Sequence, residues 1–369
     1  MKMLFWADGF WPRLGGTETQ GIQFVEGMHR RGHECIVLAQ KDHPSWKEED
    51  EYRGIPIQRF NFNAILETRD VKKIGPIKEY LDWAANVFQP DIVYLNTLFW
   101  GSAFVFLLFR RLFQIPVILT IHAPYFEEGI PPLMEQICRE ADWICCGSKW
   151  GSSVMEKRLP SMRERFKTIY YGISWPKEEP APPPFSPPTL LLLGRLSVEK
   201  GFDVAIEAFS LLKKSGSPAL LLIVGDGPYR PALETLVAEL NLTPFVRFAG
   251  AVLNADIPLF LNRASFVVIP SHFEAFGLVA VESMQMGRAV IASNVGGLPE
   301  IVSDPERGVL VPPRNPVALY RAMASFLDQP QEIVNRGVRA REWIRERFTL
   351  TENLDQYEAL FEEAILCSR

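Results

Sequence analysis

The sequence has no excess of positive charge and no long apolar run. Its 39 Lys and Arg are outnumbered by 44 Asp and Glu, which gives a formal net charge of −5. Proteins that bind nucleic acid over much of their surface are strongly basic, so this charge argues against that class. The longest apolar stretch lies between Asn96 and Arg110 and is shorter than the about 20 residues of a membrane-spanning helix. A local basic patch remains compatible with the composition.

Cysteine is also scarce. The five cysteines are Cys35, Cys138, Cys145, Cys146 and Cys367. Their spacing matches no common metal site, so we expect no bound metal, no structural disulfide, and reduced thiols that serve as small apolar side chains. The first seven residues run directly into Asp8-Gly9, without a basic segment followed by an apolar one. We therefore expect no secretory leader and a cytoplasmic location.

The composition and the prolines predict two domains. An apolar fraction of 47% and a charged fraction of 22% are typical of globular proteins, and 369 residues suggest two domains. Six of the twelve residues at 177–188 are proline, which can continue neither helix nor sheet and favours a stiff extended connector. The predicted parts are a domain at 1–172, a linker at 173–188, a domain at 189–345, and a last helix at 346–369 that returns to the first domain.

Both predicted domains alternate short apolar strands with helices. The expected strands are residues 3–7, 33–39, 92–95, 117–121 and 143–146, then 189–193, 219–224, 246–248, 266–269, 289–292 and 308–311. The expected helices include residues 17–31, 202–214, 230–240, 277–286 and 316–327. This alternation favours parallel sheets covered on both faces. The predicted fold class is α/β, with two Rossmann-like βαβ domains that face each other across a cleft.

Ligands of such domains bind beyond the carboxyl ends of the strands. Arg195 and Lys200 follow the strand at 189–193 and precede a helix. Two cations beside the N–H groups of a helix suit a diphosphate. The alternative is that both are ordinary exposed surface charges, as most Lys and Arg side chains are.

Two carboxylates and a pair of glycines follow the next strands. Glu274 lies on the predicted loop after the strand at 266–269, and Glu282 lies inside the following helix. If that helix begins near Gly277, its free N–H groups could hold phosphate while the carboxylates accept hydrogen bonds from sugar hydroxyls. The alternative is a carboxylate that stabilises the start of a helix and a second, solvated one. The turn at Gly296-Gly297 either runs against a ligand or is an ordinary turn.

The first domain offers weaker candidates. Gly15-Gly16 open a helix for which Thr17 is the expected N-cap; they form either a capped turn or a loop that closes on a ligand. His122 follows the strand at 117–121. A lone histidine is more often structural, but its place at a strand end keeps a functional role open.

A basic cluster lies late in the first domain. It consists of Lys157, Arg158, Arg163, Arg165 and Lys167. One interpretation is a solvated helix face, and the other is a patch that contacts anionic lipid or a phosphorylated acceptor. A peripheral contact with a membrane therefore stays open.

Together these residues resemble the retaining GT-B glycosyltransferases of family 4, the glycosyl transferases group 1. The motifs that carry the resemblance are Gly194-Arg195 with Lys200-Gly201, the E-x7-E pair Glu274 and Glu282 with Phe276-Gly277-Leu278 between them, Gly287, Gly296-Gly297 and Gly15-Gly16. The resemblance implies transfer of a sugar from a nucleotide-diphosphate sugar to an acceptor hydroxyl, with retention of configuration and without metal or cofactor. Ser174 stands where the family often has an acid.

The resemblance also implies roles for individual residues. Arg195 and Lys200 would neutralise the leaving diphosphate, Glu274 and His122 would contact the donor sugar, and Glu282 would bind the ribose. The residues implied in nucleotide-sugar binding are Gly15, Gly16, Arg195, Lys200, Glu274, Ala275, Phe276, Gly277, Leu278 and Glu282, and those implied in catalysis are Glu274, His122, Arg195 and Lys200. The expected partners are the donor and a hydroxyl-bearing acceptor. Alternatives are a nucleotide-sugar-binding protein without turnover, a nucleotide-sugar epimerase, and a phosphorylase that uses pyridoxal phosphate.

Overall fold

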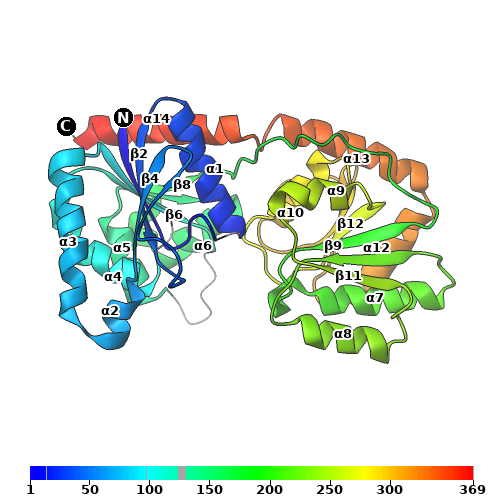
Figure 1. The fold of residues 1–369 in the computed structure, drawn as a ribbon. Coiled ribbons are helices and arrows are strands. Elements are labelled where there is room, and N and C mark those ends of the chain that lie inside the picture. Colours follow the sequence, from blue (N-terminus) through cyan, green and yellow to red (C-terminus); the bar gives the residue numbers. More distant parts are fainter. Residues whose placement is uncertain (14, 97, 124–129, 369) are drawn as a thin grey trace. The chain divides into compact units, whose positions relative to one another are not determined.

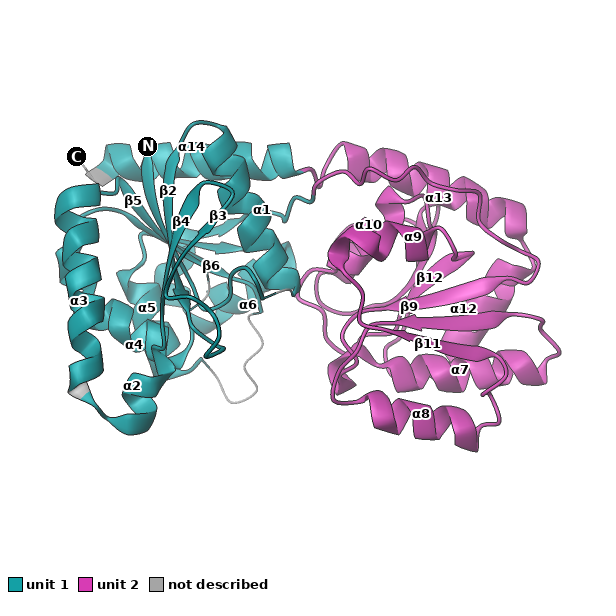
Figure 2. Cartoon of the chain, in the orientation of Figure 1, with its two compact units in different colours: residues 1–173, 350–369 teal, residues 174–349 magenta. Residues whose placement is uncertain are grey.

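A computed structural model describes residues 1–13, 15–96, 98–123 and 130–368. The chain divides into two compact units, shown in teal and magenta in Figure 2. Unit 1 comprises Met1–Ile173 with Leu350–Arg369, and unit 2 comprises Ser174–Thr349.

Unit 1 is built on an eight-stranded sheet with the order β3-β4-β2-β1-β5-β6-β7-β8 (Figure 1). The strands are β1 (Lys2–Ala7), β2 (Glu34–Gln40), β3 (Glu49–Tyr52), β4 (Ile55–Phe60), β5 (Ile92–Asn96), β6 (Val117–Ile121), β7 (Trp143–Cys146) and β8 (Phe166–Thr168). The helices are α1 (Gly16–Arg30), α2 (Asn63–Thr68), α3 (Ile74–Trp83), α4 (Trp100–Phe109), α5 (Pro132–Glu140), α6 (Lys149–Arg158) and α14 (Leu350–Ser368). Every neighbouring pair is parallel except β3 with β4.

Alternate residues of the central strand β1 enter two different cores. Leu4 and Trp6 join the cluster on one face of the sheet, while Met3, Phe5 and Ala7 join the cluster on the other face. Because helices cover both faces, the strand is almost continuously apolar and buried instead of alternating between apolar and polar residues.

The last helix, α14, packs against α1 within unit 1. Gly27 of α1 faces Leu354, so closely that a Cβ at position 27 would lie 2.5 Å from a Leu354 methyl carbon. Arg31 forms ion pairs with Asp355, at 2.8 Å, and with Glu358. The C-terminal segment is therefore an integral layer of the first unit.

Unit 2 contains a six-stranded parallel sheet with the order β11-β10-β9-β12-β13-β14. The strands are β9 (Thr189–Leu193), β10 (Leu220–Val224), β11 (Val246–Gly250), β12 (Phe266–Ile269), β13 (Val290–Ser293) and β14 (Gly308–Val311). The helices are α7 (Phe202–Lys214), α8 (Arg230–Glu239), α9 (Ile257–Leu261), α10 (Leu278–Gln285), α11 (Leu298–Val302), α12 (Pro316–Leu327) and α13 (Pro330–Arg345). Counted from its first strand this is the 3-2-1-4-5-6 order of Rossmann folds, with the reversal between β9 and β12. The prediction of Rossmann-like α/β domains is confirmed.

One local prediction was wrong. Thr17 is not the N-cap of α1, since Gly15 takes that place with an extended backbone and no side-chain cap; the Thr17 hydroxyl instead donates to the neighbouring Glu18 carboxylate at 2.9 Å. The proline-rich segment, for which the sequence predicts a stiff extended connector, is part of unit 2. It lies on unit 2, where Arg288 donates to the carbonyl oxygen of Ala181 at 2.7 Å and Ser265 donates to that of Pro184.

The cysteines and the apolar run are placed as follows. The five cysteines are free thiols, four of them buried and Cys367 exposed. The apolar run forms α4, which buries Val105 and Phe106 and exposes Trp100 and Leu108. Among the described residues no helix combines the length and apolar character needed to cross a bilayer.

Candidate functional site

The candidate site of unit 2 lies at the reversal point of its sheet. Strand β9 pairs with β12, so the loops that follow these two strands emerge side by side at the same edge. Lys200, after β9, places its ammonium nitrogen 2.7 Å from Oε2 of Glu274, after β12. The ion pair joins residues 74 positions apart and is partly buried. The structure thus brings together two of the residues that the sequence singled out.

Close backbone contacts fix these loops. Gly201 has φ +64°, and a Cβ there would lie 2.2 Å from the carbonyl oxygen of Pro270. Gly296, in the turn after β13, has φ +56°, and a Cβ there would lie 1.7 Å from the carbonyl oxygen of Glu274. That same oxygen accepts a hydrogen bond from the Gly297 amide at 3.0 Å. Only glycine fits these positions, and the backbone of Glu274 is held as a result.

Arg195 extends from the same edge of the sheet. It is exposed, and its guanidinium makes no ion pair or side-chain hydrogen bond with the described residues. The side chain is close enough to act on Glu199: burial raises the pKa of that carboxyl, but the Ser197 hydroxyl, Lys200 and Arg195 together hold it below its ordinary value. Arg195 is therefore a cation available to a ligand.

The start of α10 adds amide donors. The helix begins at Leu278, one residue later than predicted, after Gly277 with φ +119°. The N–H groups of Gly277 and Leu278 have no acceptor within the described ranges of the chain. Ala275 and Phe276 precede them on the loop, and the buried Phe276 ring packs against Phe348 with ring centroids 5.6 Å apart. The start of α10 therefore carries a partial positive charge from N–H groups that lack an acceptor, and the loop before it is anchored by Phe276.

Glu282 lies in the second turn of α10. It is partly buried, and burial raises the pKa of its carboxyl to about 7. Its carboxyl has no hydrogen-bond partner among the residues described here, and it forms no ion pair with Lys200. The structure therefore joins Glu274, but not Glu282, to Lys200.

In unit 1 the sheet reverses between β1 and β5. Gly15 and Gly16 stand at the start of α1 beside this point. The carboxylate of Glu18, buried with 8% exposure, lies against Gly15 and forms an ion pair with Arg13, whose Nε is 3.0 Å away. Arg13 also pairs with Asp42 at 2.7 Å. Gly15 thus lies against a cluster of charged side chains that the sequence did not suggest.

His122 follows β6, as predicted, and is buried with 8% exposure. Burial lowers the pKa of its ring to about 4, so the ring is neutral. Nε2 donates to Oδ1 of Asn96 at 2.7 Å, and Nδ1 accepts from the Tyr171 hydroxyl at 2.6 Å. A sugar hydroxyl that bound a ring nitrogen would have to replace one of these partners.

Sequence reasoning missed Asp8. It directly follows β1, and both of its carboxylate oxygens accept hydrogen bonds, from the Ser102 hydroxyl and the Phe99 amide at the start of α4. Burial raises the pKa of Asp8 to about 7, although these bonds lower it. The rule that selected residues just after strands would have found it.

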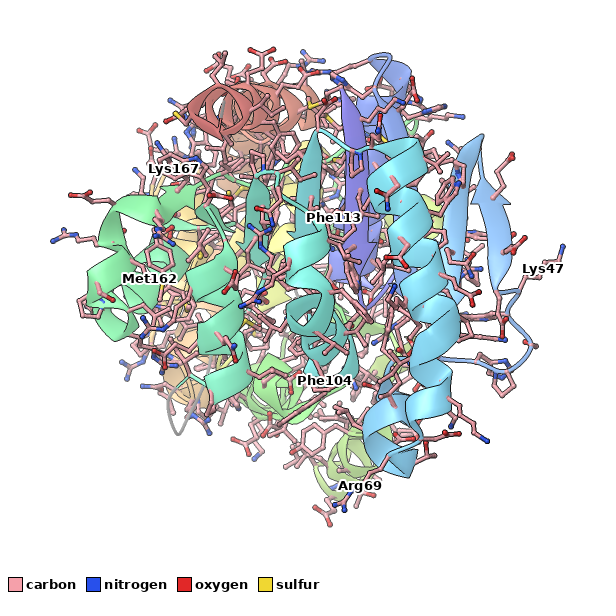
Figure 3. All side chains as sticks on the ribbon, turned by 90° about the vertical axis from the view of Figure 1, so that its left-hand side faces the viewer. Lys47, Arg69, Phe104, Phe113, Met162 and Lys167 are labelled. Carbon is pink, nitrogen blue, oxygen red and sulfur yellow. The ribbon has the colours of Figure 1, made fainter. Side chains whose placement is uncertain are left out.

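The basic cluster spans three elements and is no single helix face. Lys157 and Arg158 end α6, and Arg163 pairs with Glu156 at 3.4 Å. Arg165 donates to the carbonyl oxygens of Arg139 and Ala141. Lys167, labelled in Figure 3, lies on β8 with its ammonium 4.3 Å from the centre of the Trp143 ring. Arg165 and Lys167 therefore make contacts within unit 1.

No group of three or more His, Cys, Asp or Glu side chains suited to a metal ion is found within the ranges that the structure describes.

Comparison with known proteins extends these observations. The family model for glycosyl transferases group 1 matches residues 176–343, and that for glycosyltransferase family 4 matches residues 14–174. A GDP-mannose-dependent alpha-(1-6)-phosphatidylinositol monomannoside mannosyltransferase of Mycobacterium tuberculosis is 31% identical over 93% of each chain. A glycogen synthase of the same species is 29% identical, over 91% of this chain and 88% of the relative.

Solved structures agree on the fold. Sucrose-phosphate synthase of Thermosynechococcus elongatus superposes with a TM-score of 0.83 over the whole of both chains, at 23% identity. Anabaena HepE in complex with UDP and glucose superposes with a TM-score of 0.81, over 98% of this chain and 99% of HepE, at 21% identity. The chain is thus a GT-B protein with two Rossmann-like domains. It belongs to the group 1 glycosyltransferases, and it is a transferase enzyme. The comparisons do not favour a binding protein without turnover or an epimerase.

Proposed function

We propose that this glycosyltransferase moves a sugar from a nucleotide-diphosphate sugar to an acceptor hydroxyl, with retention of configuration and without a metal ion. The observation that carries the proposal is the cationic edge of unit 2: Lys200 and Arg195 follow β9, and the amides of Gly277 and Leu278, which lack an acceptor in the described structure, follow the neighbouring strand β12. The HepE structures, with UDP-glucose or with UDP and glucose, and the mannosyltransferase named for GDP-mannose support a nucleotide-sugar donor.

The cations would act on the leaving group. Breaking the bond between the sugar and the diphosphate builds negative charge on the phosphate oxygens. Arg195, Lys200 and the partial positive charge at the start of α10 would then stabilise the transition state more than the bound donor. Because these protein charges can neutralise the diphosphate, the reaction would proceed without a metal ion.

Lys200 would also connect the diphosphate of the donor with Glu274, the proposed sugar-binding residue. In the structure its ammonium is hydrogen-bonded to Glu274, and a bound diphosphate would share that ammonium. Glu274 would then be held beside the reacting centre, and its second oxygen, Oε1, which has no partner among the described residues, would accept a hydrogen bond from a hydroxyl of the donor sugar.

Retention would follow from attack on the face from which the diphosphate leaves. The leaving phosphate would take the proton of the acceptor hydroxyl. Glu274 and Glu282 would therefore bind the donor, and would not be the acid and nucleophile of a retaining hydrolase. Glu282, which lacks a hydrogen-bond partner in the described structure, would accept hydrogen bonds from the ribose. His122 would contact the sugar by exchanging one of its present partners.

The first experiment identifies the donor and tests the site together. Thermal shift with UDP-, GDP- and ADP-linked sugars selects the donor, and calorimetry measures binding of the matching nucleoside diphosphate. Since each charged hydrogen bond contributes about 1.5–3 kcal/mol, Arg195→Ala with Lys200→Ala should weaken binding about 100-fold or more. Unchanged affinity would refute the assignment.

The control removes two equally charged side chains elsewhere in unit 2. Lys214 and Arg321 are exposed, and replacing both by Ala should leave the affinity as it is. Transfer in the presence of EDTA tests independence from metal, and the anomeric configuration of the product, read by NMR, tests retention. Loss of transfer on chelation, or an inverted product, would contradict the corresponding part of the proposal.

A further inference from the structure

A second candidate binding site lies in unit 2, away from the edge just described. It is a groove of about 640 Å³ between the proline-rich segment and helix α13; in Figure 1 the two run along the same side of the unit. Arg288 lines it, immediately before Ala289 and β13. The groove therefore lies toward the amino end of β13, whereas the candidate donor site follows the carboxyl ends of the strands.

Helix α13 is amphipathic across this groove. Its buried positions include Gly337 and Ala340; Gly337 packs so tightly that a Cβ there would lie 2.0 Å from the carbonyl oxygen of Gly287. On the flank of the helix beside this buried face, Val334 and Val338 line the groove, and Val338 is 53% exposed. The walls of the groove are therefore apolar valines on one side and prolines on the other.

Arg288 is the unusual member of the lining. It is 1% exposed, and its guanidinium donates to the carbonyl oxygens of Leu261 and Ala181, each at 2.7 Å, and to Oδ1 of Asn262 at 3.0 Å. No carboxylate among the described residues lies within ion-pair distance of it, and its Nη1 has no acceptor there. Burial lowers the pKa of Arg288 to about 10, which reflects the cost of a desolvated charge without a counter-charge.

The other charges of the groove are partly neutralised. Arg341 pairs with Glu179 at 3.1 Å and donates from Nε to the carbonyl oxygen of Gln285. Arg345 lies over the Trp175 ring, at 5.2 Å. Glu342 is the second acid of the lining. Of these three arginines only Arg341 forms an ion pair among the described residues, and Arg288 is the buried one.

We propose that this groove binds a small organic anion with an apolar body. The anionic head accepts a hydrogen bond from Nη1 of Arg288 and supplies its missing counter-charge, and the body packs between Pro182 and Val338. The lining suits such a ligand because a few polar groups among apolar walls fix the orientation of a bound small molecule.

The test uses 8-anilinonaphthalene-1-sulfonate, an aromatic anion whose fluorescence rises in apolar sites. The full chain should bind one equivalent with saturation. Arg288→Met removes the cation, and Val338→Glu adds a negative charge to an exposed position on the wall; each should weaken binding at least tenfold. Val338→Glu keeps the test valid if Arg288→Met does not fold. No saturable binding, or wild-type affinity in Val338→Glu, would overturn the proposal.

Controls separate this groove from other surfaces and the charge from the apolar body. Val317→Glu, at a position 47% exposed on α12, should bind the probe like the wild type, and so should the Arg195→Ala, Lys200→Ala variant. Hexyl phosphate or hexanoate should displace the probe, and the stronger of the two identifies the preferred head group. Hexanol should not displace it, and displacement by hexanol as strong as by both anions would contradict a site for an anion.

Discussion

Each sheet has an edge where its strand order reverses, and the two edges differ in whether their polar side chains have hydrogen-bond partners within the protein. In unit 1, the partly buried Asp8 and the buried His122 have hydrogen-bond partners within their own unit. In unit 2, Arg195 and Glu282 have no side-chain partner in the described structure, and Lys200 has one, Glu274. Because a polar group that is buried without a partner is costly, the partly buried Glu282 points to a ligand in unit 2, whereas Asp8 and His122 already have partners without one.

The largest expected effect comes from the backbone that holds Glu274. A Cβ at Gly296 would meet a carbonyl oxygen at 1.7 Å, whereas at Gly216, with φ +87°, nothing lies within 4 Å. Gly296→Ala should displace the Glu274 loop, lower the melting temperature and weaken nucleoside-diphosphate binding beyond detection by calorimetry. Gly216→Ala should lose only about 1–2 kcal/mol to its left-handed backbone and keep its affinity. Equal affinities in the two variants would mean that the loop is not part of the site.

An intermediate effect is expected in unit 1. Tyr171→Phe removes the hydroxyl that donates to Nδ1 of His122 and leaves a buried acceptor unpaired. The free energy of unfolding should fall by about 1–3 kcal/mol in denaturant titration. Nucleoside-diphosphate affinity should stay unchanged, since the proposed contacts to that ligand are in unit 2. A loss of affinity would break the contrast between the units.

The loss of folding stability at acid pH offers a further test of unit 1. Burial lowers the pKa of His122 to about 4 from 6.5, so the unfolded chain binds more protons than the folded chain between these values. His122 should therefore cost stability progressively as the pH falls from about 6.5 to 4. In His122→Gln the stability loss caused by protonation of His122 should disappear. Melting temperatures measured between about pH 6.5 and pH 4 test this. An identical acid slope in the variant would show that His122 is not the group responsible.

The sequence predicted the central strands because they are short, apolar and followed by turns. It missed β3 and β4 for the opposite reason. Glu49–Tyr52 is an exposed edge strand of mainly acidic residues, and Ile55–Phe60 alternates buried and exposed positions without a long apolar run. The proline-rich segment was recognised as extended, but its attachment to unit 2 depends on Arg288, more than a hundred positions away.

The residues of the candidate site in unit 2 could be predicted from the sequence for a physical reason. Its residues directly follow apolar strands, and the glycines between them are needed wherever two backbones touch. The contact of Lys200 with Glu274 could not be predicted from spacing, because it depends on the pairing of β9 with β12. The same limit applied to His122, whose environment consists of Asn96 and Tyr171 from distant segments.

The sharpest test of the contrast concerns Glu282. Burial raises the pKa of its carboxyl from 4.5 to about 7, so between these values the folded chain binds more protons than the unfolded chain. The carboxyl therefore costs stability as the pH rises from 4.5 to 7. Glu282→Gln should melt above the wild type at pH 8 and together with it at pH 4.5. A lower melting temperature at pH 8 would contradict the buried, unpartnered carboxyl.

Folding favours the neutral form of the Glu282 carboxyl, whereas nucleotide binding should favour the ionised form. Ribose hydroxyls donate to the ionised carboxylate, so a bound nucleotide would favour the charged form of Glu282 and release a proton near neutral pH. Wild-type affinity for the nucleoside diphosphate should rise severalfold from pH 6 to 8, and calorimetry in buffers of different ionisation enthalpy should detect the released proton. Glu282→Gln should bind more weakly and lose this released proton. If the proton release persisted in the variant, Glu282 would be a structural group like Asp8, and the two edges would differ less than their hydrogen bonds suggest.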